Sequence, residues 1–265
     1  YWDLSPGLDF ETRLIAKTNA AAVLEQQLSK PGYVPAPINL GANTDPYQPI
    51  ERQQQLTRRC LEVLLRYRHP VTIVTKGALI LRDLDLLSEL AERRLLRVYL
   101  SLTTLDDELK RLLEPRAAAP AARLRTIRGL RGAGVAVGVL CSPMIPQIND
   151  CELESLLESA KSAGARSARY MLLRLPREVA PLFEEWLQAH YPQRAAHVLS
   201  LIRQSRGGEL YDSRFGARFT GEGVFAELLQ QRFAVACKRL GLNRRPEPEL
   251  DCSAFAPPGG QLSLL

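Results

Sequence analysis

Short apolar runs and helical patterns alternate through residues 12–174. The apolar runs have the length of buried strands and lie at residues 12–17, 37–41, 71–76, 98–103, 135–141 and 168–174. In the intervening segments apolar residues recur every three or four positions, which places them on one helix face; these segments are 19–28, 49–67, 81–94, 121–132 and 150–163. This alternation is typical of parallel β–α–β units, so the pattern predicts a doubly wound sheet or a (β/α) barrel.

The pattern changes after residue 174 and becomes mostly helical. Helical periodicity continues at residues 178–190, 194–206 and 222–240, with a glycine-rich connector at 207–223. Four prolines beyond Gly241 predict an irregular tail. We therefore expect two parts: a barrel core at residues 1–176 and a helical C-terminal extension at 177–265 that packs on it.

A polar segment follows the second predicted strand. Gly41, Asn43 and Thr44 come directly after the run at residues 37–41, ahead of a long helical pattern. A glycine lets a ligand approach the backbone, and Asn and Thr supply hydrogen-bond donors and acceptors. Ligands bind at the carboxyl ends of the strands in parallel α/β folds, so we interpret this segment as part of a site.

Polar side chains also end the following strands. Lys76 closes one β-branched strand, where it cannot cap a helix, so we interpret it as a charge for an anionic group. Ser101 closes the next strand, and Arg116 and Arg123 follow it. These two arginines could clasp a carboxylate over the strand ends, or they could be surface residues. Other polar residues near strand ends are equally explained as helix N-caps, namely Asp106, Asp107, Asn149 and Asp150.

Composition narrows the class of protein. Of 265 residues, 35 are Lys or Arg and 29 are Asp or Glu, a net charge of +6 that suits phosphate recognition but is also explained by composition bias. No apolar run approaches the length of a membrane span. The 5 cysteines show no short paired spacing. We therefore expect no disulfide framework, no complete metal-binding motif and no metal ligand within these residues, and a reducing, cytoplasmic compartment.

Taken together, these residues resemble the radical S-adenosylmethionine (SAM) superfamily, specifically an uncharacterised bacterial branch related to spore photoproduct lyase. The matching phrases are spread over the chain, at residues 5–12, 43–51, 68–76, 101–106, 114–117, 143–150, 172–179 and 260–265. The resemblance implies a partial (β/α)₆ TIM-like barrel of parallel strands. It also implies an enzyme that reductively cleaves SAM at a 4Fe–4S cluster to a 5′-deoxyadenosyl radical. A flavodoxin or ferredoxin would supply the electron.

One departure from the family concerns its three-cysteine cluster loop, CxxxCxxC, which is absent from these residues. The resemblance places this loop just upstream of Tyr1, so we expect the cluster ligands there and expect this chain alone not to carry out the radical chemistry. The alternative is a cluster-less barrel that acts as a nucleotide- or protein-binding module.

The resemblance also implies roles for individual residues. Gly41, Asn43 and Thr44 occupy the place of the glycine-rich motif that meets the SAM amino group. Lys76 and Ser101 lie where relatives contact the SAM carboxylate and ribose, and Arg116 or Arg123 would be a second carboxylate partner. Cys141 is a candidate hydrogen donor if its strand register turns it toward the site, and otherwise a small core residue.

Spore photoproduct lyase also suggests a nucleic-acid-related substrate. One stretch of arginines and aromatic residues is compatible with phosphate contacts and base stacking, and it is also explained as a plain surface loop. Its members are Arg206, Tyr211, Arg214, Phe215, Arg218 and Phe219.

Overall fold

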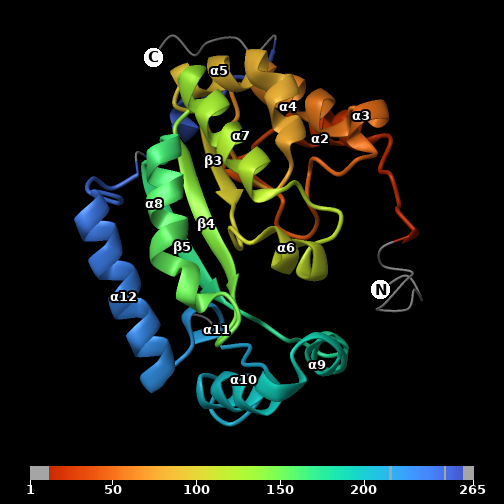
Figure 1. The fold of residues 1–265 in the computed structure, drawn as a ribbon. Helices are drawn as coiled ribbons and strands as arrows, with labels where there is room; N and C mark the ends of the chain where they lie inside the picture. Colours follow the sequence, from red (N-terminus) through yellow and green to blue (C-terminus); the bar gives the residue numbers. More distant parts are fainter. Residues whose placement is uncertain (1–11, 215–216, 248, 259–265) are drawn as a thin grey trace.

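One parallel sheet organises the molecule. The structure is a computed structural model that describes residues 12–214, 217–247 and 249–258. Its five strands follow the order β1-β2-β3-β4-β5, so each strand pairs with its neighbour in sequence. Strands β3, β4 and β5 can be followed side by side in Figure 1. They are β1 (Ile38–Leu40), β2 (Val71–Thr75), β3 (Leu96–Ser101), β4 (Val137–Met144) and β5 (Ser167–Leu172). A doubly wound sheet would reverse its strand order, whereas this sequential order is that of a partial (β/α) barrel, as predicted.

The predicted strand at residues 12–17 is wrong. Residues 13–17 have no regular structure, and Leu14 and Ile15 are 47% and 58% exposed. Only three consecutive apolar residues occur there, between Arg13 and Lys17. Such a short run buries too little apolar surface to hold an edge strand in place.

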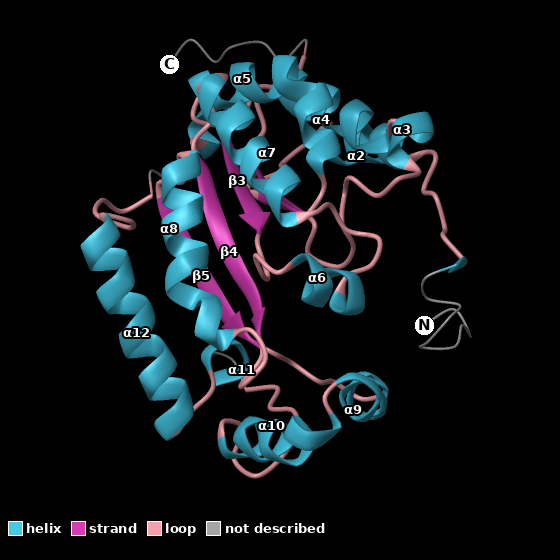
Figure 2. Cartoon of the chain, viewed as in Figure 1, coloured by secondary structure: helices cyan, strands magenta, loops and turns pink. Residues whose placement is uncertain are grey.

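Helices cover one face of the sheet (Figure 2). The side chains of Val71, Ile73, Val98 and Leu100 are fully buried under them, as expected for alternate positions of strands with one packed face. The connecting helices are α2 (Ala20–Leu28), α3 (Glu51–Gln54), α4 (Leu56–Arg66), α5 (Leu84–Glu92), α7 (Pro120–Gly132) and α8 (Leu153–Ala163). Within the predicted helix 49–67, Gln55 adopts a left-handed φ of 48° and divides α3 from α4.

A short helix at the end of β3 was not predicted. Helix α6 (Asp107–Leu113) begins at Asp106, whose carboxylate accepts hydrogen bonds from the backbone N–H groups of Glu108 (2.7 Å) and Leu109 (3.3 Å). Asp106 is therefore an N-cap, in agreement with the structural alternative for this residue. The helix is only 7 residues long, too short for a clear apolar periodicity.

The C-terminal helices contact the helices of the core at two places, α6 and α8. Helices α9 (Val179–His190) and α10 (Pro192–Gln204) lie beyond the carboxyl ends of the strands, where Trp186 donates a hydrogen bond to the Leu112 carbonyl of α6 (3.1 Å) (Figure 1). Helix α12 (Val224–Leu240) lies alongside α8, joined by the ion pair Arg232–Glu154 at 2.7 Å. A short helix, α11 (Ala217–Thr220), lies within the connector.

The tail after α12 crosses the amino ends of the strands. Backbone hydrogen bonds fix it at three points: Asn243 to the Arg166 carbonyl (3.2 Å), Asp251 to Arg94 (3.0 Å) and Ala256 to Tyr67 (3.1 Å). It contains one 3₁₀ turn, Cys252–Ala254. The described part of the tail is irregular, as predicted, and these bonds anchor it to segments beside the amino ends of the strands.

Some sequence signals lie outside the described residues. They are most of the phrase at residues 5–12, the phrase at 260–265, and Phe215 of the connector. Within the described ranges, no helix has the length and apolar content needed to cross a membrane.

Candidate functional site

The loop after β1 is held against the end of β2. Asp45 accepts hydrogen bonds from the Thr75 hydroxyl (2.6 Å) and the Lys76 backbone N–H (2.7 Å). Gly41 adopts a φ of +102°, and a Cβ at this position would lie 2.1 Å from the Val74 carbonyl oxygen. Only glycine permits this close approach, so Gly41 brings the polar loop onto the strand end.

The second half of this loop is structural. Tyr47, 4% exposed, donates a hydrogen bond to the fully buried carboxylate of Asp83 (3.1 Å). Arg82 pairs with both Asp83 (2.8 Å) and Glu51 (2.9 Å). Glu51 also accepts from the backbone N–H of Thr57 at the start of α4 (3.1 Å). The segment 45–51 therefore fixes the position of the loop, which leaves residues 41–44 as the part that can meet a ligand.

Strand register places the remaining candidates on two faces of the sheet. Val74 pairs with Tyr99, and Tyr99 with Gly138. Counting two residues along each strand puts Lys76, Ser101 and Leu140 on one face, which is not the face covered by helices. We call the carboxyl end of this face the mouth.

A buried carboxylate ties the charged groups of the mouth together. Glu114, whose side chain is 9% exposed, contacts the Lys76 ammonium through Oε1 (2.6 Å) and the Arg123 guanidinium through Oε2 (2.6 Å). The Thr103 hydroxyl lies 3.1 Å from the same Oε1. Burial raises the pKa of Glu114, but Lys76 and Arg123 outweigh this effect, so its pKa lies below the ordinary value. Glu114 is therefore ionised at neutral pH.

Lys76 and Ser101 differ in their availability to a ligand. The Lys76 side chain is 36% exposed and keeps donors beyond the one used by Glu114. Ser101 is 5% exposed at the end of β3, and its carbonyl accepts a hydrogen bond from Arg123 (3.2 Å). The cation and the hydroxyl thus share one face at adjacent strand ends, as the sequence interpretation required.

Arg123 does not occupy the place predicted for it. It is 1% exposed, and each of its three nitrogens donates to an internal acceptor: the Ala118 carbonyl (2.8 Å), the Ser101 carbonyl (3.2 Å) and Glu114 (2.6 Å). The prediction that Arg123 clasps a ligand carboxylate is corrected: this arginine positions Glu114 and the loop after α6.

Cys141 lies on the face opposite the mouth. It pairs with Tyr170 across β5 and is fully buried in the core between the sheet and the helices. Burial raises the pKa of its thiol to about 12, with a smaller contribution from Cys237. The register that a hydrogen donor needs is not the one observed, so the core alternative describes Cys141.

The other predicted residues border the mouth. Asn43 and Thr44 are exposed in the loop after β1, and within the described ranges their side chains make no hydrogen bond. Arg116 is exposed in the turn between α6 and α7. The contacts of these three residues with a ligand stay predictions.

Two further polar residues hold the loops around the mouth. Asn149, fully buried, donates to the carbonyls of Thr103 (2.8 Å) and Pro143 (2.9 Å) and so joins the loops after β3 and β4. Glu152 accepts from the Thr104 hydroxyl (2.6 Å) and the Leu105 N–H (2.7 Å). Asn149 is a loop clamp instead of the helix cap considered from the sequence, and Glu152 was not predicted.

Glu114 is the main residue that sequence reasoning missed. It lies within the phrase at residues 114–117, in which the sequence interpretation assigned a role only to Arg116. One signal could have found it: a carboxylate at the end of a helix, directly before a proline, is placed to pair with cations ending neighbouring strands. The pairing itself depends on how the loop folds back, which no local pattern encodes.

The arginine and aromatic stretch packs against the end of β5. Arg174 donates to the Tyr211 hydroxyl (3.1 Å), and its guanidinium lies 5.6 Å from the Tyr211 ring and 5.4 Å from the Phe219 ring. Arg206, 3% exposed, donates to the Leu172 and Leu173 carbonyls (3.3 and 3.0 Å). These rings already stack on arginines of the same chain.

The mouth therefore combines groups suited to a small zwitterion. A partly exposed ammonium, a buried hydroxyl and exposed amide and hydroxyl side chains can bind a carboxylate and a ribose, while Glu114 supplies negative charge. Within the described ranges, no group of three His, Cys, Asp or Glu residues is arranged to hold a metal ion.

Comparisons with known proteins agree on the family. The model of the radical SAM superfamily matches residues 38–160. Uncharacterised proteins of Mycobacterium tuberculosis and Mycobacterium bovis are 34% identical over 261 residues, which cover 97% of this chain and 73% of each relative. An uncharacterised protein of Methanocaldococcus jannaschii is 27% identical over 166 residues, covering 63% of this chain and 61% of that relative.

The fold is similar to solved structures of spore photoproduct lyase. One such structure, complexed with dinucleoside spore photoproduct, has a TM-score of 0.60 at 15% identity. The match covers 84% of this chain, which spans 64% of the length of that lyase. A double mutant of the lyase, with a TM-score of 0.60, 15% identity and the same coverage, carries bound AdoMet together with the dinucleoside. At this identity the likeness establishes the fold.

Proposed function

This chain belongs to the radical SAM superfamily, and on that premise we propose that its mouth binds SAM and that the complete protein is a radical SAM enzyme. The observation that supports the proposal most directly is the cluster of Lys76, Glu114 and Ser101 at adjacent strand ends. SAM carries a carboxylate, an amino group and a ribose, so it needs a cation, acceptors and hydroxyl contacts. The donor set of the mouth fits these needs.

Each mouth residue has a proposed task. Lys76 would hold the SAM carboxylate, and the ion pair with Glu114 would keep the Lys76 ammonium in position. The Ser101 hydroxyl would meet the ribose. Gly41 would let the loop bring Asn43 and Thr44 toward the amino group of SAM. Arg116 stays a candidate second partner for the carboxylate.

The cluster expected of this family does not fit the described residues. The five cysteines are spread over the fold: Cys141 and Cys237 are buried, Cys60 and Cys252 are partly buried, and only Cys151 is exposed. Thiolate ligands must converge within a few ångströms of one ion cluster. No step of the proposed chemistry is therefore assigned to a cluster site in this chain.

Equilibrium binding of SAM tests the proposed site. We expect the chain to bind SAM and expect Lys76→Ala to weaken binding by about tenfold, because about 1.4 kcal/mol of a charge-assisted contact is lost. Ser101→Ala should weaken it less. Arg125→Ala changes an exposed arginine on α7 and serves as the control. Unchanged affinity in both the Lys76 and Ser101 variants would refute the placement of SAM.

Activity requires the complete protein. In the complete protein a 4Fe–4S cluster with bound SAM would supply the radical chemistry, and the residues of the mouth would bind and orient SAM. We expect the complete protein, reconstituted anaerobically with iron and sulfide and reduced by a flavodoxin, a ferredoxin or dithionite, to release 5′-deoxyadenosine. SAM binding without 5′-deoxyadenosine under these conditions would favour the second candidate function, a nucleotide-binding module.

We further propose a nucleic-acid-related substrate. The proposal is supported by the likeness to spore photoproduct lyase, which is complexed with a dinucleoside in one solved structure. Incubation of the active complete protein with ultraviolet-irradiated and untreated DNA, followed by nucleoside analysis, tests it. No altered nucleoside in either DNA would count against this substrate class.

A further inference from the structure

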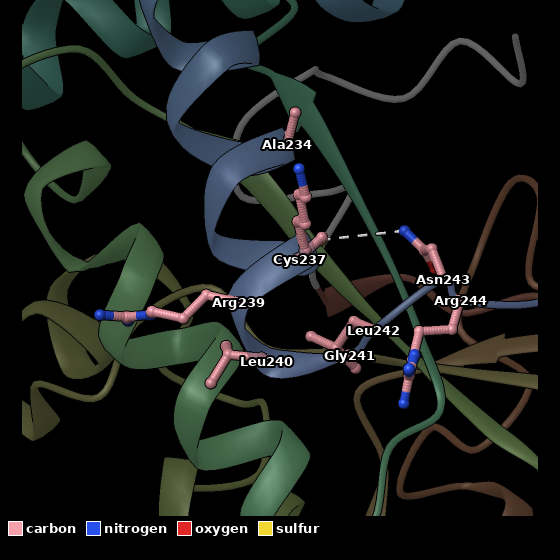
Figure 3. Close-up of a pocket in the computed structure, with 9 residues that line it drawn as sticks. Ala234, Cys237, Arg239, Leu240, Gly241, Leu242, Asn243 and Arg244 are labelled. Atoms are coloured by element: carbon pink, nitrogen blue, oxygen red, sulfur yellow. Dashed lines mark hydrogen bonds between the residues drawn. The ribbon is translucent and has the colours of Figure 1, made fainter.

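A second concave region lies at the end of the molecule opposite the mouth. Helix α12 ends at Gly241, which has a φ of +66°, and the chain then turns beneath β5. Asn243 fixes this turn: its side chain accepts from the Ala168 N–H (2.9 Å) and donates to the Ala168 carbonyl (3.0 Å), in the manner of a neighbouring strand. Figure 3 shows the same side chain directed toward Cys237.

Two cavities meet at this turn. The first, about 770 Å³, surrounds the end of α12, and the second, about 480 Å³, lies at the starts of β3 and β5. Asn243 lines both. The second cavity opens on the same sheet face as the mouth. Arg97 lies two residues before Tyr99 on β3, and Arg169 of β5 pairs with Leu140 of β4, so both arginines point to that face.

The lining of the two cavities is strongly basic. Six cationic side chains line them, and we call this region the basic groove: Arg97, Arg169, Lys238, Arg239, Arg244 and Arg245. One carboxylate, Glu247, lies among them. The formal charge of the groove is therefore +5, against +6 for the whole chain. Figure 3 shows Arg239 and Arg244 leaving the end of α12 on opposite sides, so positive charge borders the groove on both flanks.

The single carboxylate cannot balance these charges. Glu247 already pairs with Arg169 (3.0 Å) and Arg97 (3.6 Å) and accepts from the hydroxyls of Tyr99 and Ser167. The ion pairs found among the described residues include none for Lys238, Arg239, Arg244 or Arg245. Like charges gathered in one concavity repel one another, and an external anion relieves that repulsion.

The residue types that line the groove indicate which kind of anion it binds. Five of the six cations are arginines, whose planar guanidinium matches phosphate oxygens. Among the residues that the structure describes, no aromatic side chain lines either cavity, so bases would find no stacking partner there. The centre of a protein interface requires exposed apolar surface. Here the exposed apolar lining is limited to the small side chain of Ala234 and part of Leu240, because Leu242 is only 2% exposed.

We propose that the basic groove binds the phosphate backbone of a polynucleotide without reading its bases. The groove lies at the amino ends of the strands and the mouth at their carboxyl ends, so the groove would hold a strand away from the reacting centre. Binding of a polynucleotide in the groove does not depend on SAM in the mouth.

Fluorescence anisotropy with a labelled oligothymidylate of about 20 nucleotides tests the proposal. We expect micromolar binding at about 50 mM salt that weakens steeply as salt is added. Arg244→Glu/Arg245→Glu should reduce affinity by at least about tenfold and reduce the slope of log K against log salt by about 1.4, because about 0.7 is lost for each phosphate contact. Both positions are exposed, and thermal melting verifies that the variant is folded.

A matched control separates the groove from general basicity. Arg125→Glu/Arg128→Glu changes the net charge equally on the exposed side of α7 and should bind the oligonucleotide as the wild type does. Three results would overturn the proposal: no oligonucleotide binding at low salt, an equal loss in the control variant, or equally tight binding of polyglutamate. A preserved SAM affinity in the Arg244/Arg245 variant would show that the mouth is unaffected.

Discussion

The two ends of the sheet handle positive charge differently. At the mouth, Lys76 and Arg123 share the buried carboxylate of Glu114, each at 2.6 Å. At the amino end, the six cations of the basic groove face one carboxylate, Glu247. These three groups of the mouth leave a formal charge of +1 and are held by internal contacts, whereas the groove keeps a charge of +5.

This difference indicates two kinds of recognition. Internal pairing fixes the positions of Lys76 and Ser101 before any ligand arrives, which suits a small molecule that must be held in one orientation. Unbalanced charge at the surface acts over a longer range and depends on salt, which suits an extended polyanion. The same fold can therefore place a geometric site and an electrostatic site at opposite ends of its strands.

Removal of the mouth carboxylate should have the largest effect. Glu114→Ala leaves the buried guanidinium of Arg123 without its counter-charge, so we expect a loss of about 3–5 kcal/mol in the free energy of unfolding. Chemical denaturation measures it. Glu108→Ala changes an exposed glutamate on α6, the helix that ends just before Glu114, and should cost less than about 0.5 kcal/mol.

A double variant sharpens this result. Glu114→Gln/Arg123→Met removes both charges, and we expect it to lose less stability than the sum of the two single substitutions. If the two losses add, Glu114 and Arg123 have no interaction free energy, and the charged groups of the mouth are not held in place by internal ion pairs.

The close approach of the loop to β2 should give the next largest effect. Gly41→Ala would bring a Cβ to 2.1 Å from the Val74 carbonyl oxygen at a φ of +102°, and we expect it to cost about 2–3 kcal/mol and to weaken SAM binding. Gly32→Ala is the matched control, because Gly32 also has a positive φ (+75°) but nothing lies within 4 Å of its Cβ position. It should cost about 1 kcal/mol. Equal losses would mean that φ alone matters at Gly41.

Much of the fold could be predicted from the sequence because its signals are local. The apolar run at residues 71–76 and the helical face of residues 150–163 each follow from spacing within one element, and they correspond to β2 and α8. The prediction of a strand at residues 12–17 was wrong because an edge strand depends on a partner strand and on burial, and neither can be read from the apolar run itself.

The site was predictable only as far as strand ends determine it. Lys76 and Ser101 could be placed at neighbouring strand ends because each closes a strand of known direction, and their contacts with a ligand stay predictions. Arg123 was misplaced and Glu114 was missed because their positions depend on the loop after α6 folding back beneath Ser101. The basic groove was missed for the same reason: Arg97 and Arg245 meet only when the tail crosses the sheet.

Acid should reduce the stabilising contribution of Glu114 to the folded protein within a narrow pH range. Burial raises the pKa of folded Glu114, but Lys76 and Arg123 lower it by more, so the pKa lies below its ordinary value. Its stabilising contribution is therefore fully present above the unfolded pKa of about 4.3 and is lost as pH falls through the folded pKa. Thermal melts of the wild type and Glu114→Gln should converge over this range. A constant difference between them down to the lowest pH would contradict the lowered pKa.

Anions should stabilise the amino end by the smallest amount. Inorganic phosphate at a few times its dissociation constant should raise the melting temperature by about 2–4 °C relative to chloride at equal ionic strength, because binding to the folded state contributes about 1 kcal/mol. Arg244→Gln/Arg245→Gln should lose most of this shift. Arg125→Gln/Arg128→Gln should retain it, which separates binding in the groove from the general effect of phosphate on protein stability. If both variants respond as the wild type does, the excess charge at the amino end binds no anion, and the contrast between the two ends of the sheet would lie in composition alone.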